Sequence, residues 1–312
     1  MSGDSDEDDW FESGVNEDAE TSTDATAAGS ESGPEGERPD APDPFGDEDP
    51  MDADGEDLFD DDFGSAFEGG DGTDFDEDFD SDIPRIDTGV EGLDEMVQGG
   101  VPSRSLMVVI GSAGTGKTTF GLQFLRRGLQ NGERAVYITL EETHDAILAT
   151  AEEKGWDFAT HVEEDRLAIV DLDPVEMANS LSSIRSDLPR LVDDFDAERL
   201  VLDSVSLLEM MYDDQAERRT EVFDFTKALK RAGVSTMLTS EASEGSPYAS
   251  RHGIIEYLTD AVFVLQYVRS EFQETRLAVE VQKIRNTNHS RETKPYEITD
   301  SGISVYQQAN IF

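Results

Sequence analysis

Short apolar runs alternate with longer segments of helical periodicity between about residues 104 and 240. The apolar runs have the length and composition of buried strands and lie near 105–110, 134–140, 167–172, 199–203 and 235–240. Helices are expected in the gaps, over residues 117–130, 143–154, 175–195 and 215–232. This alternation is typical of an α/β fold with a mainly parallel sheet flanked by crossover helices.

The pattern changes beyond residue 260. Apolar runs at 261–265, 276–283 and 296–306 follow one another with turn residues between them and no helical segment. We expect these runs to form C-terminal antiparallel strands that extend the sheet.

Residues 1–82 show neither the periodicity of a helix nor that of a strand, and they contain 33 Asp or Glu against one Arg. Such a segment cannot bury enough apolar surface to offset the entropy of ordering, so we predict a disordered acidic tail over 1–82 and one folded domain over 83–312. Phenylalanines among the acids, such as Phe59 and Phe75, are candidates for contact with a protein partner. A purely solvating tail is the simpler interpretation.

Charge and composition narrow the class of protein further. The formal net charge is −48, and residues 83–312 alone carry 39 acidic against 23 basic residues, with only 6 Lys beside 17 Arg. A Lys-poor, acid-rich domain resembles proteins of salt-accumulating archaea. The absence of Cys excludes thiol and disulfide chemistry. Without an apolar leader or a run of about 18 apolar residues, we expect a cytoplasmic chain with no membrane insertion.

A phosphate-binding loop follows the first of these strands. The pattern G-x-x-x-x-G-K-[ST] is matched by Gly111, Ser112, Ala113, Gly114, Thr115, Gly116, Lys117 and Thr118, with Thr119 next in the helix. Glycines let the backbone N–H groups approach a phosphate, and the positive end of the helix favours the anion. We expect Lys117 to reach the β- and γ-phosphates of ATP and the Thr118 hydroxyl to bind Mg²⁺.

Carboxylates end two other strands. Asp203 closes the apolar run that begins at Arg199, which is the place of a Walker B carboxylate that holds Mg²⁺ through water. Glu141 and Glu142 follow the strand near 134–140, and one of them is a candidate base for the attacking water. Capping of the next helix is the competing role for either Glu.

These motifs together resemble the KaiC-type branch of the RecA/P-loop ATPase superfamily. The resemblance also includes the opening from Ile86 to Asp94, the Gly99–Pro102 segment, and the stretch from Gly253 to Asp260. It implies a RecA-like fold, ATP and Mg²⁺ as cofactors, slow ATP hydrolysis and a homo-oligomer, most simply a hexameric ring. In such rings a K-x-R segment acts on the nucleotide of the neighbouring subunit, and Lys283 and Arg285 match it here, with His289 as a further candidate.

The resemblance covers one domain, whereas the circadian clock protein of this family has two in tandem. We therefore expect a nucleotide-driven regulatory or signalling switch rather than a clock component. One alternative is a recombinase-like, DNA-binding repair ATPase, which the short basic groupings disfavour. Another is a non-hydrolysing ATP-sensing scaffold that resembles the archaellum-motor regulator.

Overall fold

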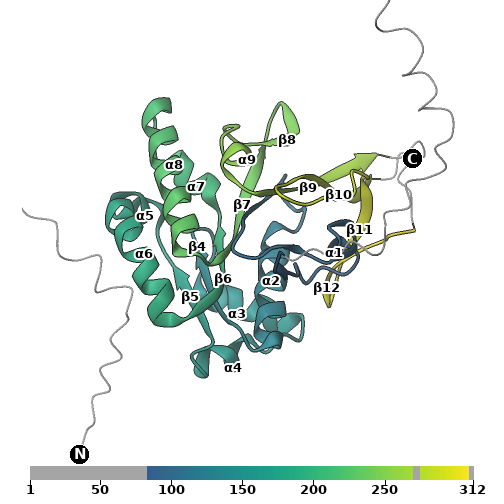
Figure 1. Ribbon diagram of the computed structural model, residues 1–312, viewed down its shortest axis with the longest axis horizontal. Helices are drawn as coiled ribbons and strands as arrows, with labels where there is room; N and C mark the ends of the chain where they lie inside the picture. The colour runs from purple at the N-terminus through teal and green to yellow at the C-terminus, as the bar shows by residue number, and fades with distance from the viewer. Residues whose placement is uncertain (1–82, 270–274, 309–312) are drawn as a thin grey trace, which may run out of the picture. The chain divides into compact units, whose positions relative to one another are not determined.

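The computed structural model describes residues 83–269 and 275–308 (Figure 1). The predicted acidic tail over residues 1–82 lies outside the described residues, so its disorder and the domain boundary at residue 83 stay predictions.

A ten-stranded sheet runs through the described part of the chain in the order β12-β11-β10-β9-β3-β7-β6-β4-β5, with β8 paired to β7. Its parallel strands are β3 (Leu106–Gly111), β4 (Arg134–Thr139), β5 (Leu167–Asp171), β6 (Ala197–Asp203), β7 (Ser235–Ser243) and β9 (Ala261–Arg269). Antiparallel pairing adds β8 (Ser246–Ser250), β10 (Thr275–Ile284), β11 (Lys294–Thr299) and β12 (Gly302–Val305). This confirms the α/β class with a mainly parallel sheet and late antiparallel strands.

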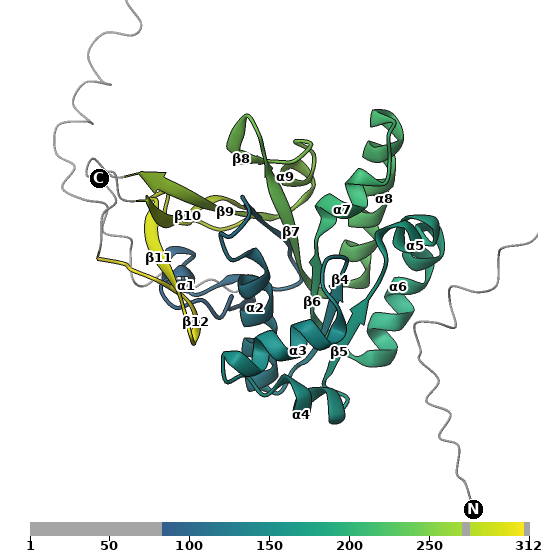
Figure 2. The same ribbon diagram turned by 180° about the vertical axis from the view of Figure 1, so that it is seen from behind.

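Helices cover both faces of the sheet, because the central strands are apolar on both sides. In β3, Met107 and Val109 pack into one core cluster, whereas Leu106, Val108 and Ile110 pack into the other. The first face carries α1 (Leu93–Met96), α2 (Lys117–Asn131), α3 (His144–Glu153) and α4 (Phe158–Glu163). The second face carries α5 (Pro174–Asn179), α6 (Leu181–Phe195), α7 (Val205–Met210), α8 (Gln215–Ala232) and α9 (Ile255–Leu258) (Figure 2).

The predicted elements are present, with three differences. The helix expected over 175–195 divides at Ser180, which ends α5 and begins α6. The run at 296–306 forms two strands, because Asp300 and Ser301 make a turn between them. Seven short elements have too few residues to show periodicity and were not predicted: β1 (Arg85–Ile86), α1, β2 (Val101–Pro102), α4, α7, β8 and α9.

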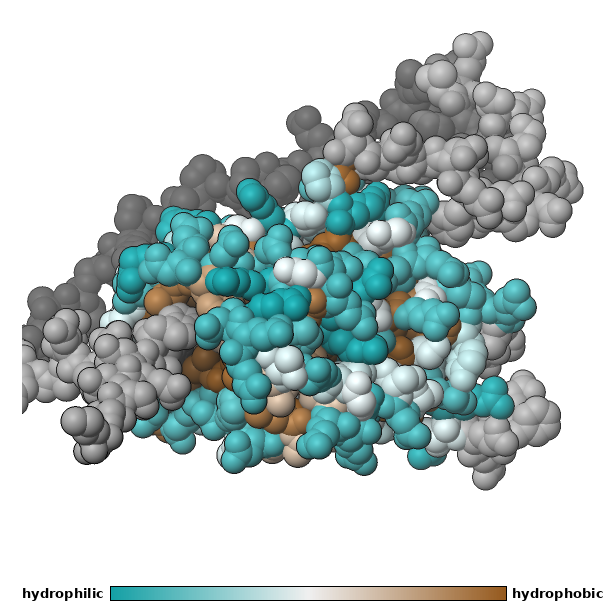
Figure 3. Space-filling model, turned by 90° about the horizontal axis from the view of Figure 1, so that it is seen from below, coloured by the Kyte–Doolittle hydropathy of each residue, from teal (hydrophilic) through white to brown (hydrophobic). Residues whose placement is uncertain are grey.

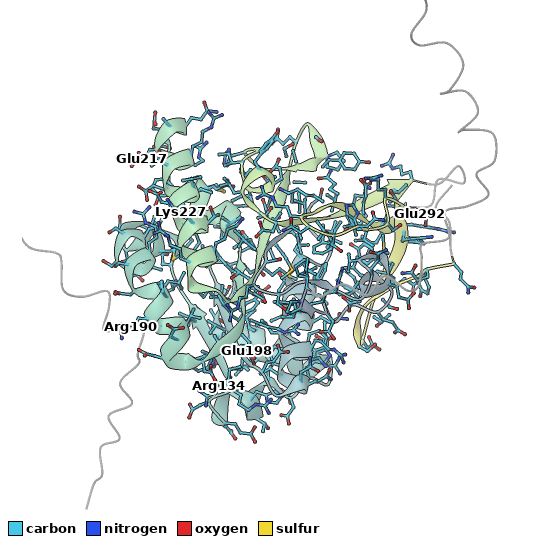
Figure 4. All side chains as sticks on the ribbon, viewed as in Figure 1. Arg134, Arg190, Glu198, Glu217, Lys227 and Glu292 are labelled. Atoms are coloured by element: carbon cyan, nitrogen blue, oxygen red, sulfur yellow. The ribbon has the colours of Figure 1, made fainter. Side chains whose placement is uncertain are left out.

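The outer surface is polar. Glu217 and Lys227 on α8 and Arg190 on α6 lie on the outer side of these helices (Figure 4). The face seen in Figure 3 is mostly hydrophilic, with hydrophobic residues in small separate groups. Among the helices of the described residues, none has the length and apolar character needed to cross a membrane.

A buried arginine joins the opening of the domain to the sheet. The first residues form a two-stranded sheet of β1 (Arg85–Ile86) and β2 (Val101–Pro102). The Arg199 side chain, 1% exposed on β6, pairs with Glu133 at 2.5 Å and with Asp87 at 3.1 Å. It also donates to the carbonyl oxygens of Asp87 and Phe124 at 2.8 and 2.9 Å. These bonds fix the segment after β1 against the amino-terminal part of β6.

We predict that Arg199→Met lowers the free energy of unfolding by about 3 kcal/mol or more, because it leaves the Glu133 carboxylate without its arginine and Asp87 with Arg127 alone. The matched control is Arg190→Met, whose pair with Asp194 joins side chains 66% and 65% exposed. Loss of such an exposed pair changes stability by less than about 1 kcal/mol. Chemical denaturation of both variants measures the difference, and equal losses would contradict the structural role of Arg199.

Candidate functional site

The loop between β3 and α2 has the backbone shape that its glycines predict. Gly116 has a φ of 88°, and a Cβ there would lie 2.7 Å from the Ile298 side chain. At Gly111, a Cβ would lie 2.9 Å from the Leu265 carbonyl oxygen of the neighbouring β9. Any larger residue at these two positions would push the loop away from the strands that support it.

Two tyrosines from the late strands support the same loop, and neither was predicted as a site residue. The Tyr296 hydroxyl donates to the Thr115 carbonyl oxygen at 2.5 Å, and the Tyr267 hydroxyl donates to that of Ala113 at 3.4 Å. Burial raises the pKa of Tyr296, so its phenol stays protonated and remains a donor. The loop tip at Ser112, Ala113 and Gly114 is exposed.

Lys117 directs its ammonium back over the loop. Nζ donates to the carbonyl oxygens of Gly111 and Ser112 at 3.0 and 3.3 Å and to Glu241 Oε1 at 2.7 Å. Glu241 lies on β7, opposite Gly111 in the parallel register of β3 and β7. The side chain of Lys117 is only 9% exposed, whereas that of Glu241 is 34% exposed, so water reaches this ion pair from the Glu241 side.

Asp203 is the buried centre of a second group of polar side chains. Its carboxylate accepts hydrogen bonds from the Thr118 hydroxyl and the Tyr137 hydroxyl, both at 2.7 Å, and from the Thr239 hydroxyl. Burial first, and then the charge of Asp203, raise the pKa of Tyr137 well above its ordinary value, so Tyr137 donates throughout the physiological range. Tyr137 and Thr239 were not found from the sequence.

The structure therefore brings the two predicted metal ligands, Thr118 and Asp203, into direct contact. A hydroxyl and a carboxylate are the oxygen ligands that Mg²⁺ prefers, and Mg²⁺ takes its other ligands from phosphate and water. Within the described residues, no group of three or more His, Asp and Glu side chains is arranged to hold a metal by itself. The residues fit a magnesium ion that arrives with a nucleotide.

Glu141 and Glu142 lie beside Asp203, because Thr139 pairs with Asp203 across β4 and β6. The Thr139 hydroxyl accepts from the backbone N–H groups of Glu141 and Glu142 at 3.2 and 2.9 Å, which fixes the turn that carries both carboxylates. Neither Glu is the N-cap of α3, because that position is Thr143. Partial burial, followed by the charges of Asp203 and Glu141, raises the pKa of Glu142.

Lys283 and Arg285 lie far from the phosphate loop of their own chain. They occupy the end of β10, where Ile284 pairs with Ala261 at the start of β9, whereas Gly111 is next to Leu265 further along β9. Both cations point to the same element: Lys283 Nζ donates to the Glu256 carbonyl oxygen at 2.7 Å and Arg285 to that of Tyr257 at 3.2 Å. If Lys283 and Arg285 act on a nucleotide, it is one bound to the phosphate loop of another subunit.

Comparison with known proteins agrees with these motifs. A family model described as the ATPase KaiC matches residues 86–310. The chain belongs to the KaiC family of ATPases. It is 34% identical over 231 residues to the circadian clock oscillator protein KaiC of Synechococcus elongatus, covering 72% of this chain and 44% of that protein. The corresponding protein of Parathermosynechococcus lividus is 32% identical over 231 residues, covering 72% of this chain and 42% of its own length.

Among solved structures, a KaiC-like protein of the archaeon Pyrococcus horikoshii aligns with a TM-score of 0.64 and 33% identity, covering 72% of this chain and 99% of that one. The chain spans less than half the length of the cyanobacterial relatives but nearly all of the archaeal one. The family and the RecA-like fold predicted from the motifs are thus confirmed.

A buried carboxylate lies on α7, directly after the Asp203 strand. Glu209 is fully buried, and neither of its carboxylate oxygens has a hydrogen-bond partner among the described residues. Burial raises its pKa to about 7; the nearby Glu256 adds to the rise, and Arg218 and Arg251 oppose it. The folded domain therefore holds a proton on Glu209 that the unfolded chain releases near pH 4.5.

We predict that Glu209→Gln stabilises the domain at pH 8 and has little effect at pH 4. Below pH 4.5 the Glu209 carboxyl is protonated in both the folded and the unfolded state. As pH rises from 4.5 toward 7 it ionises only in the unfolded state, so the free energy of unfolding falls. The neutral amide avoids this loss, which is roughly 3 kcal/mol at pH 8. Denaturation midpoints of both proteins across this pH range measure the effect, and a pH-independent difference would contradict it.

Proposed function

We propose that this chain binds ATP with Mg²⁺ at the Gly111–Thr119 loop, hydrolyses it, and acts as a nucleotide-driven switch within a homo-oligomer. The observation that carries the proposal is the 2.7 Å hydrogen bond between Thr118 and Asp203, next to the Lys117 ammonium. It supports a site where phosphate and metal ligands converge. The KaiC family match supports the same activity.

Each part of the site has a chemical task in this proposal. The loop N–H groups and the amino end of α2 bind phosphate oxygens, and Lys117 neutralises negative charge on them. When bound, Mg²⁺ would supply charge neutralisation of the phosphates, with Thr118 and Asp203 as its protein ligands. Tyr137 and Thr239 hold the Asp203 carboxylate in one orientation by donating to it.

Glu142 is the better candidate for the base that orients and deprotonates the attacking water. Burial first, and then the charge of Asp203, raise its pKa, and the turn that carries it follows Thr139, which pairs with Asp203 across β4 and β6. A raised pKa also makes the carboxylate a stronger base. Glu141 belongs to the same turn and contributes to the rise. In this proposal, the negative charge of Glu141 helps to keep the pKa of Glu142 raised.

For Lys117→Ala we predict a loss of ATP affinity of roughly 100-fold or more, since charge-assisted hydrogen bonds contribute about 1.5–3 kcal/mol each.

Glu142→Gln should keep nucleotide affinity and lower the rate of ATP turnover by roughly 10²- to 10⁴-fold, with a smaller loss for Glu141→Gln. Calorimetry and phosphate release measure these quantities. Wild-type turnover in a Glu141→Gln, Glu142→Gln double variant would exclude both as the base, and a wild-type protein that binds without turnover would favour the ATP-sensing scaffold.

The position of Lys283 and Arg285 supports the proposed homo-oligomer. Both cations lie at the opposite end of the strands from their own phosphate loop, so we place them at the nucleotide of a neighbouring subunit in a closed ring, with six subunits as the expected number. Two adjacent cations there would neutralise the charge that develops on the transferred phosphate.

Mixed oligomers test this arrangement. We predict that Lys117→Ala subunits and Arg285→Ala subunits, each inactive alone, regain ATPase activity when mixed, because some interfaces then combine an intact loop with an intact Arg285. Light scattering with ATP at molar salt gives the subunit number. A monomer without recovery of activity would show that the two cations are only surface charges.

The DNA-binding alternative has less support. A protein that tracks nucleic acid needs free cations along a surface. Here Arg127 pairs with Asp87, Lys230 pairs with Asp260, and Arg218 donates to the backbone of Glu209 and Tyr212. One cation of each basic grouping is thus engaged within the domain.

A further inference from the structure

The carboxylate of Glu241 occupies a place that the chemistry of the phosphate loop requires for a phosphate. Glu241 Oε1 lies 2.7 Å from Lys117 Nζ. An ammonium has three donors, and those of Lys117 are directed to Gly111 O, Ser112 O and Glu241. A phosphate oxygen can bind Lys117 only if one of these three acceptors leaves.

The acceptor that leaves is Glu241. The two carbonyl oxygens belong to the loop backbone that surrounds the phosphate, whereas Glu241 is a free carboxylate, one-third exposed. A carboxylate beside a phosphate is disfavoured by repulsion between like charges. Binding of the terminal phosphate therefore exchanges one anion for another at Lys117.

The backbone of Glu241 cannot follow its side chain easily. Its N–H donates to the Ser206 hydroxyl of α7 at 2.7 Å, and its residue pairs with Gly111 in the sheet. Ser206 is in turn 3.2 Å from the Ser240 hydroxyl. Release therefore moves the Glu241 side chain while its backbone stays in the sheet, directly before the β7–β8 hairpin pairing that starts at Ala242.

That hairpin leads directly to the segment that holds the interface cations. Ala242 pairs with Ser250 between β7 and β8. The Ser250 hydroxyl donates to the Glu256 side chain at 2.5 Å, and the Glu256 carbonyl oxygen accepts from Lys283 at 2.7 Å. Only two contacts therefore separate the residue paired with Ala242 from Lys283.

We infer that Glu241 is a competitor of the terminal phosphate for Lys117, and that its release couples the nucleotide of one subunit to the β7–β8 hairpin, α9 and Lys283. This inference rests on the proposed ATP binding at the same loop. It gives Glu241 two exclusive states: paired with Lys117, or released and free to make other contacts.

The test compares Glu241→Gln with the matched control Glu244→Gln, an exposed acid at the turn of the same hairpin. The probe is a non-hydrolysable ATP analogue with Mg²⁺, titrated by calorimetry into the full chain. We expect Glu241→Gln to bind about tenfold more tightly, equivalent to about 1.4 kcal/mol, because the phosphate no longer displaces a charged partner. The control should stay within about twofold of wild type.

Hydrogen exchange of residues 246–258 gives a second measurement. In the wild type, exchange should change when the analogue binds; in Glu241→Gln that change should be largely lost, since the side chain is already released. Glu241→Asp, shorter by about 1.5 Å, should also bind more tightly than wild type because it cannot hold the pair.

The outcomes separate the inference from the proposed function. Wild-type affinity in Glu241→Gln, tightening in Glu241→Gln alone but not in Glu241→Asp, or an unchanged exchange response would each overturn the role of Glu241 while leaving ATP binding intact. Absence of binding by the wild type and by every variant would instead overturn the proposed function itself.

Discussion

The Asp203 carboxylate is the interaction on which the site depends. A buried anion must be compensated by hydrogen bonds, and here the donors come from α2, β4 and β7 while the carboxylate itself ends β6. Because Thr118, Tyr137 and Thr239 all have to meet one group, the start of the phosphate-loop helix and three strands are held in a single arrangement. The site is thus prepared by the fold before any nucleotide arrives.

The direction of the strands divides the chemistry between two ends of the sheet. The parallel strands β3, β4, β6 and β7 bring the phosphate loop, Glu142, Asp203 and Glu241 to their carboxyl ends. β10 is antiparallel to β9, so its carboxyl end, with Lys283 and Arg285, lies at the other end. One chain therefore carries the phosphate loop and the two cations on different surfaces. In the ring proposed above, this polarity requires each copy to meet the next in the same orientation.

The sequence was most informative where chemistry depends on residues close together in the chain. The phosphate loop, the Asp203 strand and the Glu141–Glu142 turn each lie within a single run of residues, and their strands and helices were predicted within a few positions. Tyr137 and Thr239 are different: each sits in an ordinary strand and reaches the site only through the register of β3, β4, β6 and β7. Glu209 likewise looks like a surface residue in sequence, and only the packing of α7 buries it.

The same strand carries both of the buried ionic groups that anchor the domain. Arg199 and Asp203 lie four residues apart on β6, the first bound to the opening segment and the second to the phosphate-loop helix. A strand bonded at both positions cannot slide along its axis without breaking the buried ion pairs of Arg199 or the hydrogen bonds of Asp203. Any movement within the domain must therefore take place in elements that β6 does not hold, and the β7–β8 hairpin and α9 are among these.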